Sequence, residues 1–418
     1  MHYPRLQARA ARAAFGIRQS SARRCFATSA FQSDIVLLKD KKNARNDGTL
    51  VTLGANNTTH THRGFINHAD IIGKEPRQLV QSTKGASYRI HEPTLAEYVR
   101  LTPRMVTPIY PSDTNTIVSL LDIHVDTPSG ISEGPPLEIL EAGTGHGALT
   151  LHLSRAIHAA NPPIPRAPSH ATSSDIEDPV YEGGTVSDLH DIGIETWKKT
   201  RRAIVHTLDI SSKHSKYAEK IVAGFRKGMY AGNVDFQVGD VSSWVAEQKA
   251  SRNTDDPFLS HVFLDLPNAD SHLANVAPVL HVNGMLAVFN PSITQIADCV
   301  DAIRRHRMPY LLDQVIELGV GTIRDWDVRA VRPRATLKKA EVEQEPAIPS
   351  AEPIDPVEEQ EARDDELAED LAKNEEKWAM VCRPKVGQLV VGGGFLGLWR
   401  RMEKAPVTEA QAEAQAEA

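Results

Sequence analysis

One stretch, residues 137–155 (LEILEAGTGHGALTLHLSR), constrains the fold of this chain more than any other. A short apolar run precedes three closely spaced glycines and then apolar residues at helical spacing, which predicts a strand, a turn and a helix. Gly143, Gly145 and Gly147 let the turn approach a ligand closely, and a helix that begins there points its N-terminal N–H groups at that ligand. The stretch therefore predicts a nucleotide-cofactor site, although a purely structural tight turn would use the same glycines.

Acidic residues end the first two predicted strands. Glu141 stands just before the glycines, where a carboxylate suits a hydroxylated or cationic ligand better than a pyrophosphate. S-adenosylmethionine, which carries an ammonium group and a ribose, fits that requirement. Asp209 ends the next predicted strand, where an acid commonly accepts hydrogen bonds from ribose hydroxyls. The separation of Glu141 and Asp209 in the sequence is much longer than is usual for a ribose-binding acid. It becomes plausible for that role if residues 161–200, which are rich in Pro, Ser, Asp and Gly, form a surface insertion.

Strand and helix patterns alternate five times along the middle of the chain. Strands are expected within residues 137–142, 203–209, 233–238, 260–266 and 283–291, and helices at 148–157, 211–224, 242–249 and 293–306. This alternation predicts an α/β fold with a parallel sheet, helices on both faces and ligands at the carboxyl ends of the strands. Three later segments, residues 311–320, 325–334 and 388–401, are expected to close the sheet. Asp240, after the third strand, either accepts a hydrogen bond from the cofactor adenine or caps the helix that follows.

Several other segments lie outside this alternation. Residues 1–33 contain six arginines, many Ala and Ser and no acid, a composition typical of a mitochondrial presequence; a basic arm that touches RNA is the alternative. Residues 337–377 are strongly acidic and hold four prolines, which predicts a disordered insertion. The tail, residues 404–418, is expected to be solvated. The net charge of −7 is concentrated in the acidic insertion, so it does not exclude RNA binding.

The region before the glycine turn predicts a small module and a positioned aromatic side chain. Short strands separated by glycines in residues 34–90 indicate a β-rich module that either positions a macromolecular substrate or covers a sheet edge. Helices are expected at residues 93–99 and 114–123. Between them, Pro108 and Pro111 hold Tyr110 in an extended turn, where it could stack on a base or simply pack.

Some classes of protein and site are disfavoured. No run approaches the ~20 apolar residues that span a bilayer, so a soluble protein is expected. The three cysteines are too widely separated in sequence for a disulfide framework or a zinc site. His60 and His62, in the segment THTH, are expected to lie in an exposed loop and not to bind a metal.

Several specific motifs follow one another along the chain: YRIHEPTLAEYVR, VTPIYPSD, LEAGTGHGALTLHLSRAI, VHTLDIS, NVDFQVGDV, HVFLDLP, NGMLAVFNPSITQI and RDWDVRAVRPR. Together they resemble the catalytic subunits of the tRNA adenine-58 N1-methyltransferases. The resemblance covers about residues 64–334 and 378–402, apart from the two insertions.

That resemblance implies a class I S-adenosylmethionine-dependent methyltransferase, with a Rossmann-like parallel sheet and the β-rich module of residues 34–90 in front. The methyltransferase domain would comprise residues 91–336 and 378–403. S-adenosylmethionine would be the methyl donor and tRNA the substrate. The resemblance further implies a tetramer, of identical subunits in bacterial and mitochondrial members and with a non-catalytic RNA-binding subunit in nuclear ones. The presequence favours identical subunits in the mitochondrial matrix.

The resemblance also assigns site residues, motif by motif. The cofactor would be bound by Glu141, Gly143, Gly145, His146, Gly147, Asp209, Asp240 and Asp265. Asp265, in the motif DLP, would be catalytic by accepting a hydrogen bond from the adenine amino group and by stabilising the positive charge that develops on the ring. Because the Watson–Crick edge of a tRNA base is hidden, the base would be turned out and held against Tyr110.

Two departures from the family pattern leave other functions open. Asn268, Ala269 and Asp270 follow DLP where the family has Pro and Trp, which removes an aromatic wall. Gly392 and Gly393 replace a His-Thr pair before Gly394. A catalytically weak RNA-binding or assembly subunit, or an adenine N1-methyltransferase that acts on another RNA, would also be consistent with these changes.

Overall fold

The computed structural model describes residues 30, 33–42, 47–127, 134–165, 180–181, 184–185, 193–319, 326–331, 379–384 and 393–403. Its backbone contacts divide the chain into two units, residues 1–316 with 394–418 and residues 317–393. The predicted acidic insertion and tail lie outside the described residues, as does nearly all of the predicted presequence. Among the described helices, none combines the length and the apolar character needed to cross a bilayer.

A seven-stranded sheet forms the centre of the larger unit, in the order β11-β10-β7-β12-β13-β17-β14. The strands are β7 (Leu137–Ala142), β10 (Ala203–Asp209), β11 (Val234–Val238), β12 (Leu259–Leu264), β13 (Leu280–Asn290), β14 (Tyr310–Leu318) and β17 (Gly394–Arg401). The first five are parallel, as the alternation predicts, whereas β17 pairs antiparallel with β13. The chain leaves β7 toward β10 on one side and later returns on its other side at β12. The carboxyl end of β7 is therefore the switch point at which such sheets bind ligands.

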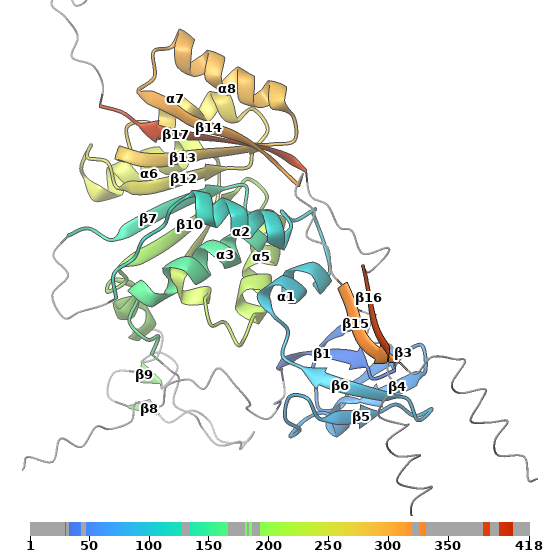
Figure 1. The fold of residues 1–418 in the computed structure, drawn as a ribbon. Helices are drawn as coiled ribbons and strands as arrows, with labels where there is room; N and C mark the ends of the chain where they lie inside the picture. Colours follow the sequence, from blue (N-terminus) through green and yellow to red (C-terminus); the bar gives the residue numbers. More distant parts are fainter. Residues whose placement is uncertain are drawn as a thin grey trace, which may run out of the picture. The chain divides into compact units, whose positions relative to one another are not determined.

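Helices cover both faces of this sheet (Figure 1). They are α2 (Pro111–Leu120), α3 (Ala148–Ile157), α5 (Ser212–Gly224), α6 (Val241–Arg252), α7 (Leu273–Val276) and α8 (Ile293–Arg305). Helix α1 (Leu95–Leu101) contacts α2 and strand β2 (Thr49–Thr52). Because side chains alternate along a strand, Leu140 and Ala142 of β7 face the apolar cluster of α6, α7 and α8. Glu141 faces the other way, toward α3. Each large apolar side chain in that cluster contributes about 1.5–3 kcal/mol by burial.

The predicted β-rich module is confirmed. A four-stranded antiparallel sheet has the order β2-β1-β6-β5, and a separate hairpin joins β3 to β4. The strands are β1 (Ile35–Asp40), β2 (Thr49–Thr52), β3 (Thr58–Thr61), β4 (Gly64–Asn67), β5 (Leu79–Gln81) and β6 (Ser87–His91), with a short helix η1 (His68–Asp70). The module has its own apolar core, which includes Leu38, Ile66 and Ile90.

Three predictions about local structure are corrected. His60 does not lie in a loop, because β3 pairs with β4 and places His60 opposite Phe65. The second helix begins at Pro111 and not at residue 114, because proline suits the first helical position and Tyr110 precedes it in extended conformation. The segment 325–334 does not close the central sheet: β15 (Trp326–Val331) pairs with β16 (Ala379–Pro384) in the smaller unit. Within the predicted surface insertion, β8 (Val180–Tyr181) and β9 (Gly184–Thr185) form a short pair.

Candidate active site

The glycine turn after β7 has the left-handed backbone that its sequence predicts. Gly143, Gly145 and Gly147 have φ values of +99°, +52° and +82°. A Cβ atom at Gly143 would overlap the backbone carbonyl of Asp265, and one at Gly147 would press against Ala218 of α5. The turn therefore packs closely against Asp265 and α5. Position 143 requires glycine both because its φ is positive and because a side chain would overlap the Asp265 carbonyl.

Backbone hydrogen bonds tie this turn to the strands on both sides of β7. The amide of Gly143 donates to the carbonyl of Leu208 at 2.8 Å, and the amide of Asp265 donates to the carbonyl of Ala142 at 2.8 Å. The carboxylate of Asp209 accepts from the amide of Gly145 at 3.1 Å. Asp209, the glycine turn and Asp265 are thus brought together at the switch point, as the sequence predicts.

Glu141 is a buried carboxylate beside this turn. Only 1% of the residue is exposed, and the Thr150 hydroxyl of α3 donates a hydrogen bond to Oε2 at 2.6 Å. The pKa of Glu141 is raised to about 7, because burial and, to a smaller extent, the charge of Asp265 outweigh the opposing hydrogen bonds from Thr150 and Thr207. Within the described part of the chain, no basic side chain forms an ion pair with Glu141.

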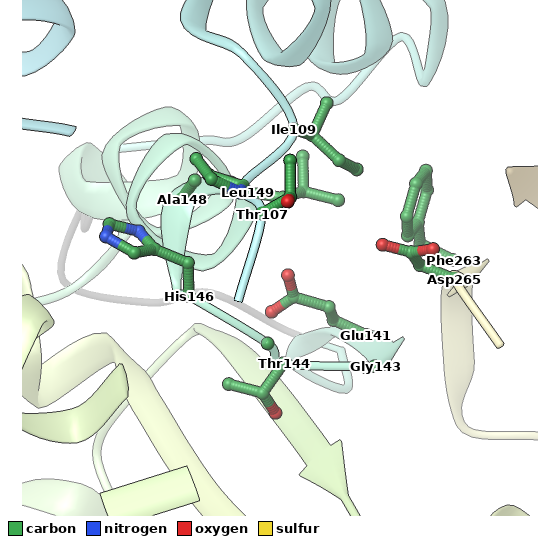
Figure 2. A pocket seen from close by; sticks show the side chains of 12 residues that line it. Thr107, Ile109, Glu141, Gly143, Thr144, His146, Ala148, Leu149, Phe263 and Asp265 are labelled. Atoms are coloured by element: carbon green, nitrogen blue, oxygen red, sulfur yellow. The ribbon is translucent and has the colours of Figure 1, made fainter. Parts of the chain in front are cut away.

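Asp265 faces the same space from the end of β12. The parallel register places Phe263 beside Glu141, and Asp265 is the next residue on that face of the sheet. Burial raises the pKa of Asp265 to about 6. Figure 2 shows the carboxylates of Glu141 and Asp265 directed into one cavity, with the Phe263 ring next to Asp265.

That cavity is lined by three parts of the chain. They are the segment Thr107 to Ile109 before α2, the turn and first residues of α3, and Phe263 with Asp265 at the end of β12. The first segment lies beside the glycine turn, where a Cβ atom at Gly145 would contact Val106 at 3.5 Å. The cavity is therefore closed on one side by residues that precede α2 (Figure 2).

His146 lines the cavity on the side away from Asp265 (Figure 2). Its ring is buried and packs at 6.3 Å, centroid to centroid, from the ring of Tyr217. Neither ring nitrogen has a hydrogen-bond partner of normal geometry in the described structure. Burial lowers the pKa of His146, Arg104 lowers it further, and the nearby Pro103 carbonyl opposes both. The neutral imidazole is available to donate to a ligand or accept from one.

The structure does not bring Tyr110 or Asp240 into the cavity lining. Tyr110 follows the lining residue Ile109, and the guanidinium of Arg104 lies 5.4 Å from the centre of its ring. Asp240 caps α6, because its Oδ1 accepts from the amides of Ser242 and Ser243 at 2.9 and 3.1 Å. The Ser243 hydroxyl also donates to Oδ2 at 2.6 Å, and this hydrogen bond, together with those from the amides, holds the pKa of Asp240 below its usual value. Of the two interpretations of Asp240, the structure shows the helix cap.

Phe263 and Thr150 belong to the site, although the sequence did not single them out. Phe263 lies two positions before Asp265, so the period-two alternation of a strand places both on one face and could have identified it. Thr150, which bonds Glu141, is an ordinary helical residue with no distinguishing sequence signal.

The departures from the family pattern have local structural explanations. Asn268 adopts a left-handed conformation and begins the short helix η4 (Ala269–His272), with Ala269 buried. Gly394 has a φ of +142°, and a Cβ atom there would meet the ring of Phe289. Gly392 lies outside the described residues. The ring of Phe263 provides an aromatic surface near Asp265.

The residues present fit S-adenosylmethionine. The turn at Gly143 is a close backbone cradle, and the buried Glu141 carboxylate lacks a basic partner in the described structure, as a site for a cationic ligand would. Asp209 ends β10 beside the turn, where a ribose is commonly bound.

Comparison with known proteins supports this view. Residues 32–80 match the family profile "TrmI-like N-terminal". Residues 183–397, just over half of the chain, match "tRNA methyltransferase complex GCD14 subunit". The chain is 27% identical over 294 residues to the tRNA (adenine(58)-N(1))-methyltransferase TrmI of Thermus thermophilus, which covers 70% of this chain and 88% of the relative.

Solved structures show the same fold. The tRNA (m1A58) methyltransferase TrmI from Aquifex aeolicus matches with a TM-score of 0.50 and 16% identity, over 90% of this chain and 100% of that one. A SAM-dependent O-methyltransferase from Thermotoga maritima matches with a TM-score of 0.55 and 16% identity, over 90% and 96%. The expected class I methyltransferase fold is thereby confirmed, with the qualification that its sheet is mixed. The chain belongs to the family of tRNA methyltransferase complex GCD14 subunits and is an S-adenosylmethionine-dependent tRNA methyltransferase.

Proposed function

We propose that this chain methylates N1 of adenine 58 in the T-loop of tRNA. The observation that carries the proposal is the pair of carboxylates, Glu141 and Asp265, that face one cavity beside a glycine cradle. The named activity of the Thermus thermophilus relative supports the choice of base and atom. S-adenosylmethionine would supply an electrophilic methyl group on a positively charged sulfur.

Asp265 has the position and chemistry to act on the target base. Adenine N1 has a free lone pair, so the reaction needs alignment more than removal of a proton. An ionised Asp265 can accept a hydrogen bond from the exocyclic amine and stabilise the positive charge that develops on the ring. Because the pKa of Asp265 is raised to about 6, the carboxylate is largely ionised at neutral pH.

The other site residues would hold the reactants. Glu141, Asp209 and the backbone of the glycine turn would bind the cofactor, and His146 would contact it from the opposite side of the cavity. Phe263 offers an apolar surface beside Asp265, and Tyr110, next to the lining segment, would stack on the base after it leaves the tRNA stack. Asp240 stays a weaker candidate for adenine contact, because its carboxylate already caps α6.

Recombinant full-length chain should transfer a labelled methyl group to unmodified tRNA and not to the same tRNA with guanine at position 58. Guanine N1 carries a proton and lacks the lone pair that the reaction requires. The measurement is tritium incorporation, followed by mapping of the modified nucleotide. Equal labelling of both tRNAs would show that the methylated nucleotide is not adenine 58.

The competing function, a catalytically weak RNA-binding or assembly subunit, is suggested by the Asn268 to Asp270 sequence after the DLP motif. It would give no labelling of either tRNA although the tRNA is still bound. We retain the methyltransferase proposal because Phe263 provides an aromatic surface beside Asp265. A homotetramer is the proposed assembly, with a heterotetramer that includes a non-catalytic subunit as the alternative.

The chain is also proposed to act in the mitochondrial matrix, on the composition of residues 1–33. A fluorescent fusion of the full chain should colocalise with a mitochondrial marker, and deletion of residues 1–33 should leave it in the cytosol. Replacement of the six arginines in that segment by glutamine, with its length kept, should have the same effect as the deletion. Unchanged mitochondrial fluorescence in both variants would contradict the presequence.

A further inference from the structure

Glu141 and Asp265 are two acids that lie near each other in one largely desolvated cavity. The row of residues across the sheet at Glu141 contains Thr207 on one side and Phe263 on the other, so neither neighbour carries a positive charge. Thr150 supplies a neutral hydroxyl. Ionising both acids therefore costs desolvation and mutual repulsion, with no basic partner in the described structure to offset them.

The other titratable groups around the cavity do not supply that missing charge. From the start of α3, His146 is held neutral by its burial, and from β12, His261 has its pKa lowered to about 4 by burial. From β10, Asp209 is a third acid, which is bonded by the amides of Gly145 and Ser211 and has His214 at 3.6 Å. The guanidinium of Arg104, before α2, lies over the Tyr110 ring. The carboxylate of Asp113, in α2, accepts a hydrogen bond from the Ser112 hydroxyl.

We propose that Glu141 and Asp265 together retain one proton in the cofactor-free protein and release it to solvent when S-adenosylmethionine binds. This inference rests on the proposed function, because it requires that the cationic methyl donor occupy this cavity. The balance is simple: one carboxylic acid becomes a carboxylate, and its proton leaves as the positive ligand enters.

The electrostatics of the cavity give the direction of the effect. Burial raises the pKa of Asp265 to about 6, and burial together with the charge of Asp265 raises that of Glu141 to about 7, so the titration of one acid depends on the other. A cation in the cavity favours the fully ionised pair. The affinity for S-adenosylmethionine should thus fall as the pH decreases, by up to about tenfold per pH unit where the pair holds one proton, and become level above the pKa range of the pair.

This arrangement would distinguish the methyl donor from its product. S-adenosylhomocysteine lacks the sulfonium charge, so it compensates the two carboxylates less and should release a smaller fraction of a proton. The product is then favoured relative to the donor as the pH falls. The pair of acids would be a specificity determinant for the charged form of the cofactor.

Isothermal titration calorimetry of the full chain tests this proposal directly. At about pH 6.5, binding of S-adenosylmethionine in two buffers of different ionisation enthalpy should show release of close to one proton, and S-adenosylhomocysteine clearly less. Glu141→Gln keeps an acceptor for Thr150 and removes one titrating group, so the proton release should fall by more than half. Comparison with the unchanged chain cancels proton exchange by the cofactor itself.

Glu138→Gln is the matched control. Glu138 lies on the same strand and is equally buried, but Arg252 donates to both of its oxygens at 2.9 and 2.7 Å, and its pKa is lowered because hydrogen bonds from His206 and Arg252 outweigh burial. On binding S-adenosylmethionine, the Glu138→Gln variant should release as many protons as the unchanged chain. Infrared spectra of the cofactor-free protein should also show a protonated carboxyl band that weakens strongly in Glu141→Gln and disappears on raising the pH.

The outcomes separate the two proposals. Tight binding of S-adenosylmethionine without proton release, together with no protonated carboxyl band, would overturn the shared proton and leave the methyltransferase proposal intact. Absence of any cofactor binding by the folded full chain would instead contradict the proposed function.

Discussion

Replacement of Asp265 by asparagine should reduce methyl transfer to tRNA by about 10²–10³-fold, the loss typical when one group that stabilises transition-state charge is removed. Asparagine retains the shape of the side chain and can still accept a hydrogen bond from the adenine amine. It lacks the negative charge that stabilises the methylated ring, so the loss should appear in kcat. Rates are to be measured with saturating tRNA and cofactor near pH 8, where Asp265 is ionised in the unchanged chain.

Cofactor affinity at the same pH distinguishes catalysis from binding. Asp265→Asn should bind S-adenosylhomocysteine within a few-fold of the unchanged chain, because Glu141 and the glycine turn remain. Asp256→Asn is a suitable control, since Asp256 is exposed and precedes the same strand, β12. An unchanged rate for Asp265→Asn would exclude the residue from the mechanism, and a loss of cofactor affinity equal to the loss of rate would make it a binding residue.

The part of the site built by local sequence was predictable, and its geometry was confirmed. Glu141 and Asp209 lie at the carboxyl ends of β7 and β10, and the glycine turn and the DLP motif directly follow β7 and β12. Parallel strands place these ends at one edge of the sheet. The helix expected at residues 93–99 is also present, but it spans Leu95–Leu101, because Thr94 and Glu97 form a capping box that fixes its start. Such features depend on neighbouring residues, so a sequence pattern carries them.

Features that depend on distant pairing were not predictable. The segment Trp326–Val331 has the alternation of a strand, but alternation does not specify a partner, and here the partner is β16, far along the chain. Likewise, an acid after a strand can bind a ligand or cap a helix, and only the orientation of the Asp240 carboxylate shows the cap. The uncharged neighbours of Glu141, Thr207, Phe263 and Thr150, come from three separate elements, so no local pattern reveals its raised pKa.

Gly143→Ala should abolish detectable cofactor binding, with an affinity loss of at least about 10²-fold, equivalent to about 2.7 kcal/mol. Alanine disfavours the φ of +99° at this position, and its Cβ atom would overlap the backbone carbonyl of Asp265. The ends of β7 and β12 must then move apart, which displaces Glu141 and Asp265 from their shared cavity. Equilibrium dialysis with labelled S-adenosylmethionine measures the affinity, and thermal unfolding shows how much stability is lost.

Gly239→Ala separates this local effect from a general cost of losing glycine. Gly239 follows β11 of the same sheet, has no left-handed backbone, and a Cβ atom there would contact no atom within 4 Å. Its unfolding temperature and cofactor affinity should therefore match those of the unchanged chain. If Gly143→Ala bound the cofactor as well as Gly239→Ala does, the site would have accommodated the added methyl group without loss. The close approach of the turn to Asp265 would then not be what shapes the site.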